Sequence, residues 1–145
     1  MKRSLALALG TVYAVAALAG AAAAAEKATV WPAGDIKWTD NPAMKGAKVA
    51  VLWGDPAKSA YGVFRKVPAG AKLGLHTHTQ DQKVVTIAGT VEFNMEGEAK
   101  KEMGPGSYLF VPGGAAHDAT CKAGADCVYF EEAAGAADFK PATKK

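Results

Sequence analysis

Three histidines, His76, His78 and His117, are the residues of this chain best suited to bind a metal ion, and they are all the histidines it has. Imidazole nitrogen is a common ligand of transition metals. On a strand, His76 and His78 share one face while Thr77 lies on the other. With His117 on another strand, the three rings would form a three-nitrogen site with open positions for water or substrate. We predict one divalent transition metal ion here, with Fe, Zn, Mn, Ni and Cu all open.

Side chains near the histidines are the next candidates. Gln82 has the strand parity of His76 and His78, provided that no bulge intervenes, and is a candidate fourth ligand. Gln82 is equally a candidate to hydrogen-bond to a ligand without touching the metal, or to occupy a turn. Asp81 and Asp118 are candidate general bases by type, but strand parity turns both away from the site, which favours a solvated face.

The two cysteines of the chain, Cys121 and Cys127, are separated by five residues with Gly124 at the centre. This spacing is typical of a hairpin loop whose flanking strands carry opposed cysteines. In an exported chain with an even number of cysteines, we predict a disulfide. Two alternatives stay open, namely Cys121 as a thiolate ligand and two inert thiols.

The first 25 residues have the layout of a secretory signal peptide. A basic start with Lys2 and Arg3 precedes an apolar run rich in alanine and leucine, and the triplet 23–25 is an A-x-A type cleavage site. The alternative is an uncleaved anchor, since residues 4–25 are long enough to cross a bilayer. No basic stop-transfer cluster follows, so we expect cleavage, a mature chain of residues 26–145 and a periplasmic or secreted location.

The charge balance of the mature chain excludes some classes of partner. Without Lys2 and Arg3, 15 basic and 14 acidic residues remain. A nearly neutral surface offers no electrostatic footprint for nucleic acid or anionic lipid. We therefore expect a small-molecule partner, no nucleic acid, and no membrane contact after signal cleavage.

Short apolar runs divided by glycine and proline predict a single all-β domain, a sandwich or barrel with the jelly roll among the first choices. The arm 31–44 contains proline and is a candidate edge strand, and the lysine-rich tail 140–145 is expected to be disordered. The predicted strands are 49–53, 61–67, 73–79, 83–88, 90–95, 107–111, 117–121 and 127–131.

Several large apolar side chains are candidates for a substrate pocket, although a small barrel is expected to be largely filled by side chains, which favours ordinary core. Trp31, Trp38 and Trp53 are candidates to cover the barrel or to form a dimer surface. The pocket candidates are Phe64, Phe93, Met95, Tyr108, Phe110, Tyr129 and Phe130.

The spacing of the histidine segments resembles the two sequence motifs of the cupin superfamily. In the first segment, Gly70, His76, His78 and Gly89 fit, with Gln82 where the family has glutamate. In the second, the matching residues are Gly106, Pro112, Gly114 and His117, and Cys121 stands where asparagine is frequent. The motif core spans residues 70–121. The resemblance implies a cupin-type double-stranded β-helix, a jelly-roll barrel.

Flanking segments further resemble a group of bacterial cupins without assigned function, which is similar to the cupin domain of a zinc-binding anti-sigma factor. The segments that carry this likeness are 51–56, 106–108 and 112–114. Replacement of the family's glutamate by Gln82 leaves a ligand set without formal charge. A divalent ion would keep its full charge and favour an anionic partner. The same change also weakens retention of the metal.

Cupins with three histidines and no acidic ligand include iron dioxygenases, so the resemblance leaves oxygen chemistry open. We expect a metal-dependent enzyme acting on a small anionic organic molecule, with a dioxygenase slightly ahead of an isomerase or lyase. The alternative is a non-catalytic periplasmic cupin that binds a metal or small ligand for sensing or storage, or one that keeps only the fold. Cupins often pair through amino-terminal strands, which makes a homodimer a further expectation.

Overall fold

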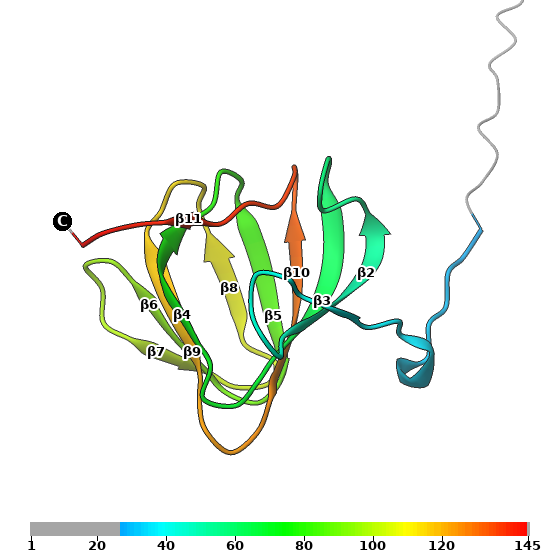
Figure 1. Ribbon diagram of the computed structural model, residues 1–145, viewed down its shortest axis with the longest axis horizontal. Helices are drawn as coiled ribbons and strands as arrows, with labels where there is room; N and C mark the ends of the chain where they lie inside the picture. Colours follow the sequence, from blue (N-terminus) through cyan, green and yellow to red (C-terminus); the bar gives the residue numbers. More distant parts are fainter. Residues whose placement is uncertain (1–26, 145) are drawn as a thin grey trace, which may run out of the picture. The chain divides into compact units, whose positions relative to one another are not determined.

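In the part of the chain that the structure describes, residues 27–144 of a computed structural model, nearly all of the regular secondary structure is β-strand (Figure 1). The predicted signal peptide, residues 1–25, lies outside the described residues. From Trp31 onward the chain forms one compact unit. The single helical element found in the described range is a 3-10 turn at Ala33–Asp35. None of the helices described has the length and apolar character needed to cross a membrane.

One antiparallel sheet has six strands in the order β1-β2-β3-β10-β5-β8. Its strands alternate between inward and outward side chains, as a half-buried sheet requires. In β3, for example, Tyr61, Val63 and Val67 are buried. The strands are β1 (Thr39–Asp40), β2 (Lys48–Gly54), β3 (Tyr61–Val67), β10 (Cys127–Ala133), β5 (Gln82–Ala88) and β8 (Tyr108–Val111).

The second antiparallel sheet has five strands in the order β11-β4-β9-β6-β7. It carries a core cluster of Phe93, Met103 and Val111, the last contributed by β8 of the first sheet. The two sheets therefore pack face to face and confirm the all-β prediction. The strands are β11 (Lys140–Pro141), β4 (Lys72–Thr77), β9 (His117–Cys121), β6 (Val91–Met95) and β7 (Lys101–Met103).

All eight predicted strands are present, with ends that differ by up to two residues. The arm supplies the edge strand β1, as proposed. Strand β7 was not expected, because Lys101–Met103 is short and lacks β-branched residues. The expectation of a disordered tail from residue 140 was wrong at its start. Lys140 and Pro141 pair with Thr77 and His76, so hydrogen bonding to β4 outweighs the polar composition of this segment.

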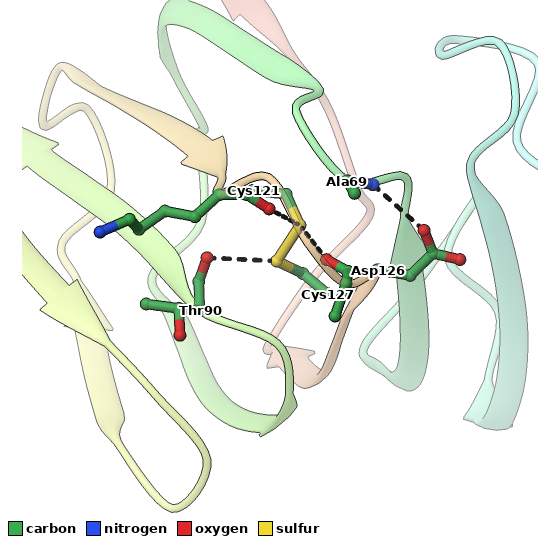
Figure 2. Close-up of a disulfide and its surroundings, with 7 residues drawn as sticks. Ala69, Thr90, Cys121, Asp126 and Cys127 are labelled. Atoms are coloured by element: carbon green, nitrogen blue, oxygen red, sulfur yellow. Dashed lines mark hydrogen bonds between the residues drawn. A yellow bond between two sulfur atoms is a disulfide. The ribbon is translucent and has the colours of Figure 1, made fainter.

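The predicted disulfide between Cys121 and Cys127 is present (Figure 2). The two residues end β9 and begin β10, with their Cα atoms 5.8 Å apart, so the bridge links the two sheets at one end of the barrel. Both cysteines are buried in a core cluster with Val67. Since both sulfurs are bonded to each other, the alternatives of a thiolate ligand and of inert free thiols do not hold.

Two motif glycines are required by the backbone. Gly89 has a φ of 71°, and a Cβ atom there would lie 2.6 Å from the carbonyl oxygen of Asp126. Gly114 has a φ of 79°, and its N–H donates a hydrogen bond to the carbonyl oxygen of His78 at 2.8 Å. L-residues with a side chain rarely adopt such φ values. Gly114 thus joins the second motif to the first beside a histidine.

Candidate metal centre

The three histidines come together as strand parity predicts. His76 on β4 lies directly opposite His117 on β9, and His78 follows immediately after the end of β4. The potential ligand atoms of the three rings all lie within 4.8 Å of one another. Ring centroids of His76 and His117 are 4.2 Å apart, and those of His76 and His78 are 4.8 Å apart. Residues 41 positions apart in sequence are therefore brought to one point by the β4–β9 register.

Each histidine ring is oriented by a backbone carbonyl. The Nδ1 atoms of His76, His78 and His117 lie 2.7, 2.5 and 3.0 Å from the carbonyl oxygens of Gly74, Asp138 and Ala115 respectively. A carbonyl oxygen only accepts, so Nδ1–H donates and Nε2 keeps its lone pair. This arrangement is how proteins fix the tautomer of metal-ligating histidines. The donor set therefore fits a transition metal ion held by three Nε2 atoms.

Burial keeps two of the rings in the neutral form that a metal requires. His76 and His117 are only 2% and 3% exposed. Burial lowers the pKa of His76 to about 4, and it also lowers the pKa of His117. Neutral imidazole is the ligating form, so neither ring must lose a proton at neutral pH to bind a metal.

Gln82 begins β5, in the opposite sheet from His76 and His117, and is buried. Its side chain lines the same cavity as the three histidines. No residue in the described range forms a hydrogen bond with the Gln82 amide group, so the amide is available to a ligand in the cavity. Asp81 and Asp118 bond to the Gly113 N–H and the Asn94 amide, and neither lines the cavity, which agrees with the predicted solvated face.

The interior of the barrel contains a cavity of about 500 Å³. The expectation of a largely filled barrel was therefore wrong, since the inward side chains of the two sheets do not meet across this space. Among the candidate pocket residues, Phe93 and Tyr129 line the cavity. Tyr108 and Phe110 are 61% and 47% exposed. The rings of Phe64 and Phe130 pack edge to face with centroids 6.2 Å apart.

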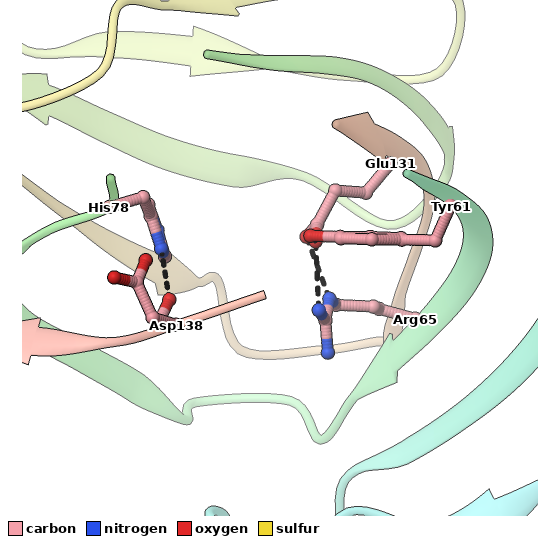
Figure 3. A network of polar contacts seen from close by, with 5 residues as sticks. All are labelled: Tyr61, Arg65, His78, Glu131 and Asp138. Carbon is pink, nitrogen blue, oxygen red and sulfur yellow. Dashed lines mark hydrogen bonds and ion pairs between the residues drawn. The ribbon is translucent and has the colours of Figure 1, made fainter. Parts of the chain in front are cut away.

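A second polar cluster, formed by Tyr61, Arg65 and Glu131, stands on β3 and β10 (Figure 3). Arg65 Nε and Nη2 donate to the two carboxylate oxygens of Glu131 at 2.6 and 2.8 Å. The Tyr61 hydroxyl donates to the same carboxylate at 2.7 Å. Arg65 and Glu131 line the cavity together with the histidines. The cluster was missed from sequence, although charged residues at inward positions of apolar strands were a usable signal.

The carboxylate of this cluster is held in its charged form. Burial alone raises the pKa of Glu131, but the attraction of Arg65 and the hydrogen bonds from Arg65 and Tyr61 outweigh it, so the pKa lies below its usual value. Burial raises the pKa of the neighbouring Tyr129, which therefore stays protonated. No hydrogen-bond partner for the Tyr129 hydroxyl is found within the described chain, so this phenol is a free donor at the cavity wall.

Comparison with solved structures identifies the fold. The polyketide cyclase RemF from Streptomyces resistomycificus has a TM-score of 0.67 to this chain at 18% identity. The match covers 82% of this chain and 88% of the cyclase. KdgF from Halomonas sp. has a TM-score of 0.61 at 22% identity and covers 74% of this chain and 94% of KdgF. An RmlC-like cupin from Shewanella frigidimarina also has a TM-score of 0.61, at 20% identity, covering 76% of this chain and 93% of that cupin. The predicted cupin-type double-stranded β-helix is confirmed.

A curated enzyme shares a shorter stretch of sequence. Dimethylsulfoniopropionate lyase DddQ of Ruegeria pomeroyi is 37% identical to this chain over 59 residues, which are 41% of this chain. The match spans only 28% of the lyase, so it relates part of one protein to part of the other.

The family assignment rests on a longer match. Residues 19–137 fit the family described as Domain of unknown function (DUF4437). The matched range includes both histidine segments and most of the barrel. Together with the cupin fold of the solved structures, this match supports the predicted superfamily. The chain belongs to the family described as Domain of unknown function (DUF4437), and it has the fold of an RmlC-like cupin.

Proposed function

We propose that this protein is a metal-dependent enzyme that acts on a small organic anion. One observation carries the proposal: three histidines, each with Nδ1 already bonded to a backbone carbonyl, converge at the wall of a cavity of about 500 Å³. A cavity of this size is in the range used for small ligands. His76, His78 and His117 would hold the ion, and Gln82 is a candidate for a fourth, neutral contact.

The charges around the cavity favour an anion. A divalent ion bound there supplies Lewis acidity, and a neutral ligand set leaves its charge undiminished. Glu131 and Asp138 are the two carboxylates among the lining residues, and both are engaged by other groups. The lining also includes Lys48, Arg65, Lys66 and Lys72. Arg65 and Lys48 are likewise engaged, by Glu131 and Asp40, whereas Lys66 and Lys72 have no ion-pair partner within the described residues. A substrate carboxylate would therefore meet free positive charge and no free negative charge among these lining residues.

The hydroxyl of Tyr129 supports a second contact with the substrate. It remains protonated because its pKa is raised, and it is free to donate a hydrogen bond within the cavity. Arg65 is less available, since Glu131 already accepts from its Nε and Nη2. We therefore assign the orienting hydrogen bond to Tyr129 and a supporting role to Arg65.

Two reaction classes fit this arrangement. The sequence alone favoured a dioxygenase, on a set of three histidines without an acidic ligand. The stretch of 59 residues that is 37% identical to a lyase now favours elimination next to a carboxylate. We place the lyase first and oxygen chemistry second. A metal site closed by a fourth protein ligand would favour the alternative of a non-catalytic binding protein. The cavity that adjoins the three histidines argues for an open site instead.

Elemental analysis of the purified protein is the first test, with the double variant His76→Ala/His78→Ala as control. We expect near-stoichiometric metal that is absent from the control. Iron would direct the next assay to oxygen uptake, and zinc would direct it to elimination from small carboxylates. Absence of metal from the wild type, before and after reconstitution with each candidate ion, would refute the proposal.

Two expectations from the sequence complete the proposal. We propose that the protein is exported and acts in the periplasm or outside the cell, on the strength of the signal-like residues 1–25. We also propose a homodimer, because cupins often pair through amino-terminal strands and because Trp31 and Trp53, in the first third of the chain, are 45% and 47% exposed. Mass spectrometry of the secreted chain tests the first, and light scattering coupled to gel filtration tests the second.

A further inference from the structure

The segment after β10, residues 134–141, crosses one end of the barrel from the first sheet to the outer edge of β4 (Figure 1). It is anchored along its length. The Ala137 N–H donates to the Pro56 carbonyl at 2.8 Å, and β11 pairs with β4 at Thr77 and His76. The segment therefore lies fixed beside the three histidines.

Asp138, which belongs to this segment, makes two kinds of contact with the residues that follow β4. Its backbone carbonyl accepts the hydrogen bond from His78 Nδ1 at 2.5 Å (Figure 3). Its side-chain Oδ1 accepts from the Thr79 N–H at 2.8 Å, and Oδ2 accepts from the Thr79 hydroxyl. Lys140 Nζ lies 3.1 Å from Oδ2 and 2.6 Å from the Thr79 hydroxyl oxygen. The carboxylate thus holds the residue next to His78 while the carbonyl holds the His78 ring.

His78 depends on this contact more than the other two histidines depend on theirs. The rings of His76 and His117 lie on paired strands, and their carbonyl partners are only two residues away in sequence. His78 lies beyond the end of β4, and its partner Asp138 is 60 residues away. Its orientation is therefore set by a remote part of the chain.

Phe139, the next residue of the segment, contacts the same site. Its ring stacks on that of His76, with centroids 4.1 Å apart and planes inclined by 19°. Phe139 is 48% exposed and also lines the cavity, so it stands at the boundary between the histidine site and solvent. The segment thereby contacts two of the three candidate ligands through consecutive residues.

We propose that Asp138 is a positioning residue for the metal centre, fixing the tautomer and direction of His78 through its carbonyl and its clamp on Thr79. The inference rests on the proposed function, because it concerns the same metal. Partners that orient a ligating histidine typically change metal affinity about 10- to 100-fold when they are lost. The C-terminal segment is then part of the site, although it contributes no ligand.

The test uses Co²⁺ alone as probe and the full mature chain. Asp138→Ala removes the clamp on Thr79 and leaves the backbone carbonyl free to move. We expect about 10-fold or more weaker Co²⁺ binding and an altered visible absorption spectrum of the bound ion. Asp126→Ala is the matched control, since Asp126 Oδ1 also accepts a backbone N–H, that of Ala69 at 3.1 Å, but near the disulfide (Figure 2).

Two milder variants keep the inference testable if Asp138→Ala fails to fold. Thr79→Val removes only the hydroxyl that donates to Asp138, and we expect the same change of spectrum in weaker form. Asp138→Asn retains an acceptor for the Thr79 N–H and should recover part of the affinity. Unchanged affinity and spectrum in Asp138→Ala and Thr79→Val, or an equal loss in Asp126→Ala, overturn the inference while leaving the proposed function intact. A wild type that binds no Co²⁺ overturns the proposed function itself.

Discussion

The cavity has two polar clusters that differ in what their atoms are bonded to. In the cluster of Tyr61, Arg65 and Glu131, the donors and the carboxylate bind each other. In the histidine cluster, each ring uses Nδ1 on a backbone carbonyl and keeps Nε2 available. Both clusters are buried and both contain shifted pKa values, so burial and pKa alone do not separate them.

The difference shows which cluster is built to bind and which to support. A carboxylate that accepts from an arginine and a tyrosine, and whose pKa is lowered, is a weak base with little capacity for a substrate. Three convergent lone pairs without a donor are suited to a cation. We therefore assign Glu131 to the stability of the barrel and the histidines to its chemistry.

We expect the largest effect on stability from a substitution that breaks the ion-paired cluster. Glu131→Ala leaves the charge of Arg65 unpaired in the barrel and should lower the free energy of unfolding by about 3–5 kcal/mol, measured by urea denaturation. Glu132→Ala is the control, because Glu132 is the next residue on β10 and pairs with exposed Lys83 at 2.8 Å. Its loss should cost less than about 1 kcal/mol. Equal losses in the two variants would contradict the supporting role of Glu131.

The reverse pattern is expected for the histidine cluster. His78→Ala removes a ligand from a half-buried position. Loss of a group that only orients a ligand costs up to about 100-fold in metal affinity, so loss of the ligand itself should cost more than that. The free energy of unfolding of the metal-free protein should change by about 1 kcal/mol or less. Isothermal titration with Co²⁺ and urea denaturation measure the two quantities. A large loss of stability with unchanged affinity would assign His78 to the core.

Gln82→Glu sharpens the charge difference between the clusters. A carboxylate among the ligands should tighten metal binding about 10-fold, equivalent to about 1.4 kcal/mol, and weaken binding of small carboxylates to the metal-loaded protein. Gln80→Glu is the matched control, since Gln80 packs against Gly135 and does not line the cavity. If Gln82→Glu changed neither metal binding nor carboxylate binding, the proposal that a neutral ligand set favours an anionic substrate would be contradicted.

The smallest effect is on acid stability. Because the folded pKa of Glu131 lies below its ordinary value of 4.5, its ion pair contributes fully above that value, and the contribution is lost as the pH falls through the folded pKa. Each unit of lowering is worth about 1.4 kcal/mol. The unfolding free energy of Glu131→Gln should therefore fall less steeply with acid than that of the wild type. Parallel curves would contradict the lowered pKa.

The sequence predicts the strands and the meeting of the histidines well, because both depend on local patterns. Side-chain alternation places His76 and His78 on one face, and the cupin spacing assigns His117 to the same site. The disulfide follows from two cysteines around a short loop. These features need only neighbours in sequence or a fixed motif.

Features that depend on distant side chains were not predictable in this way. Arg65 and Glu131 are 66 residues apart, and His78 and Asp138 are 60 residues apart, so no local pattern pairs them. The cavity depends on the summed volume of inward side chains across two sheets, which strand assignment does not give. Strand β11 has almost no strand propensity of its own and exists because β4 offers it unpaired backbone groups.

The two residues of β11 also have a consequence for association between molecules. They occupy the outer side of β4, which would otherwise be the last strand of its sheet. An exposed row of amide and carbonyl groups is a template on which another chain can add a strand. A chain shortened to end at Phe139 would bare that row, and we expect such a truncation to turn a well-behaved barrel into one that aggregates by edge-to-edge pairing.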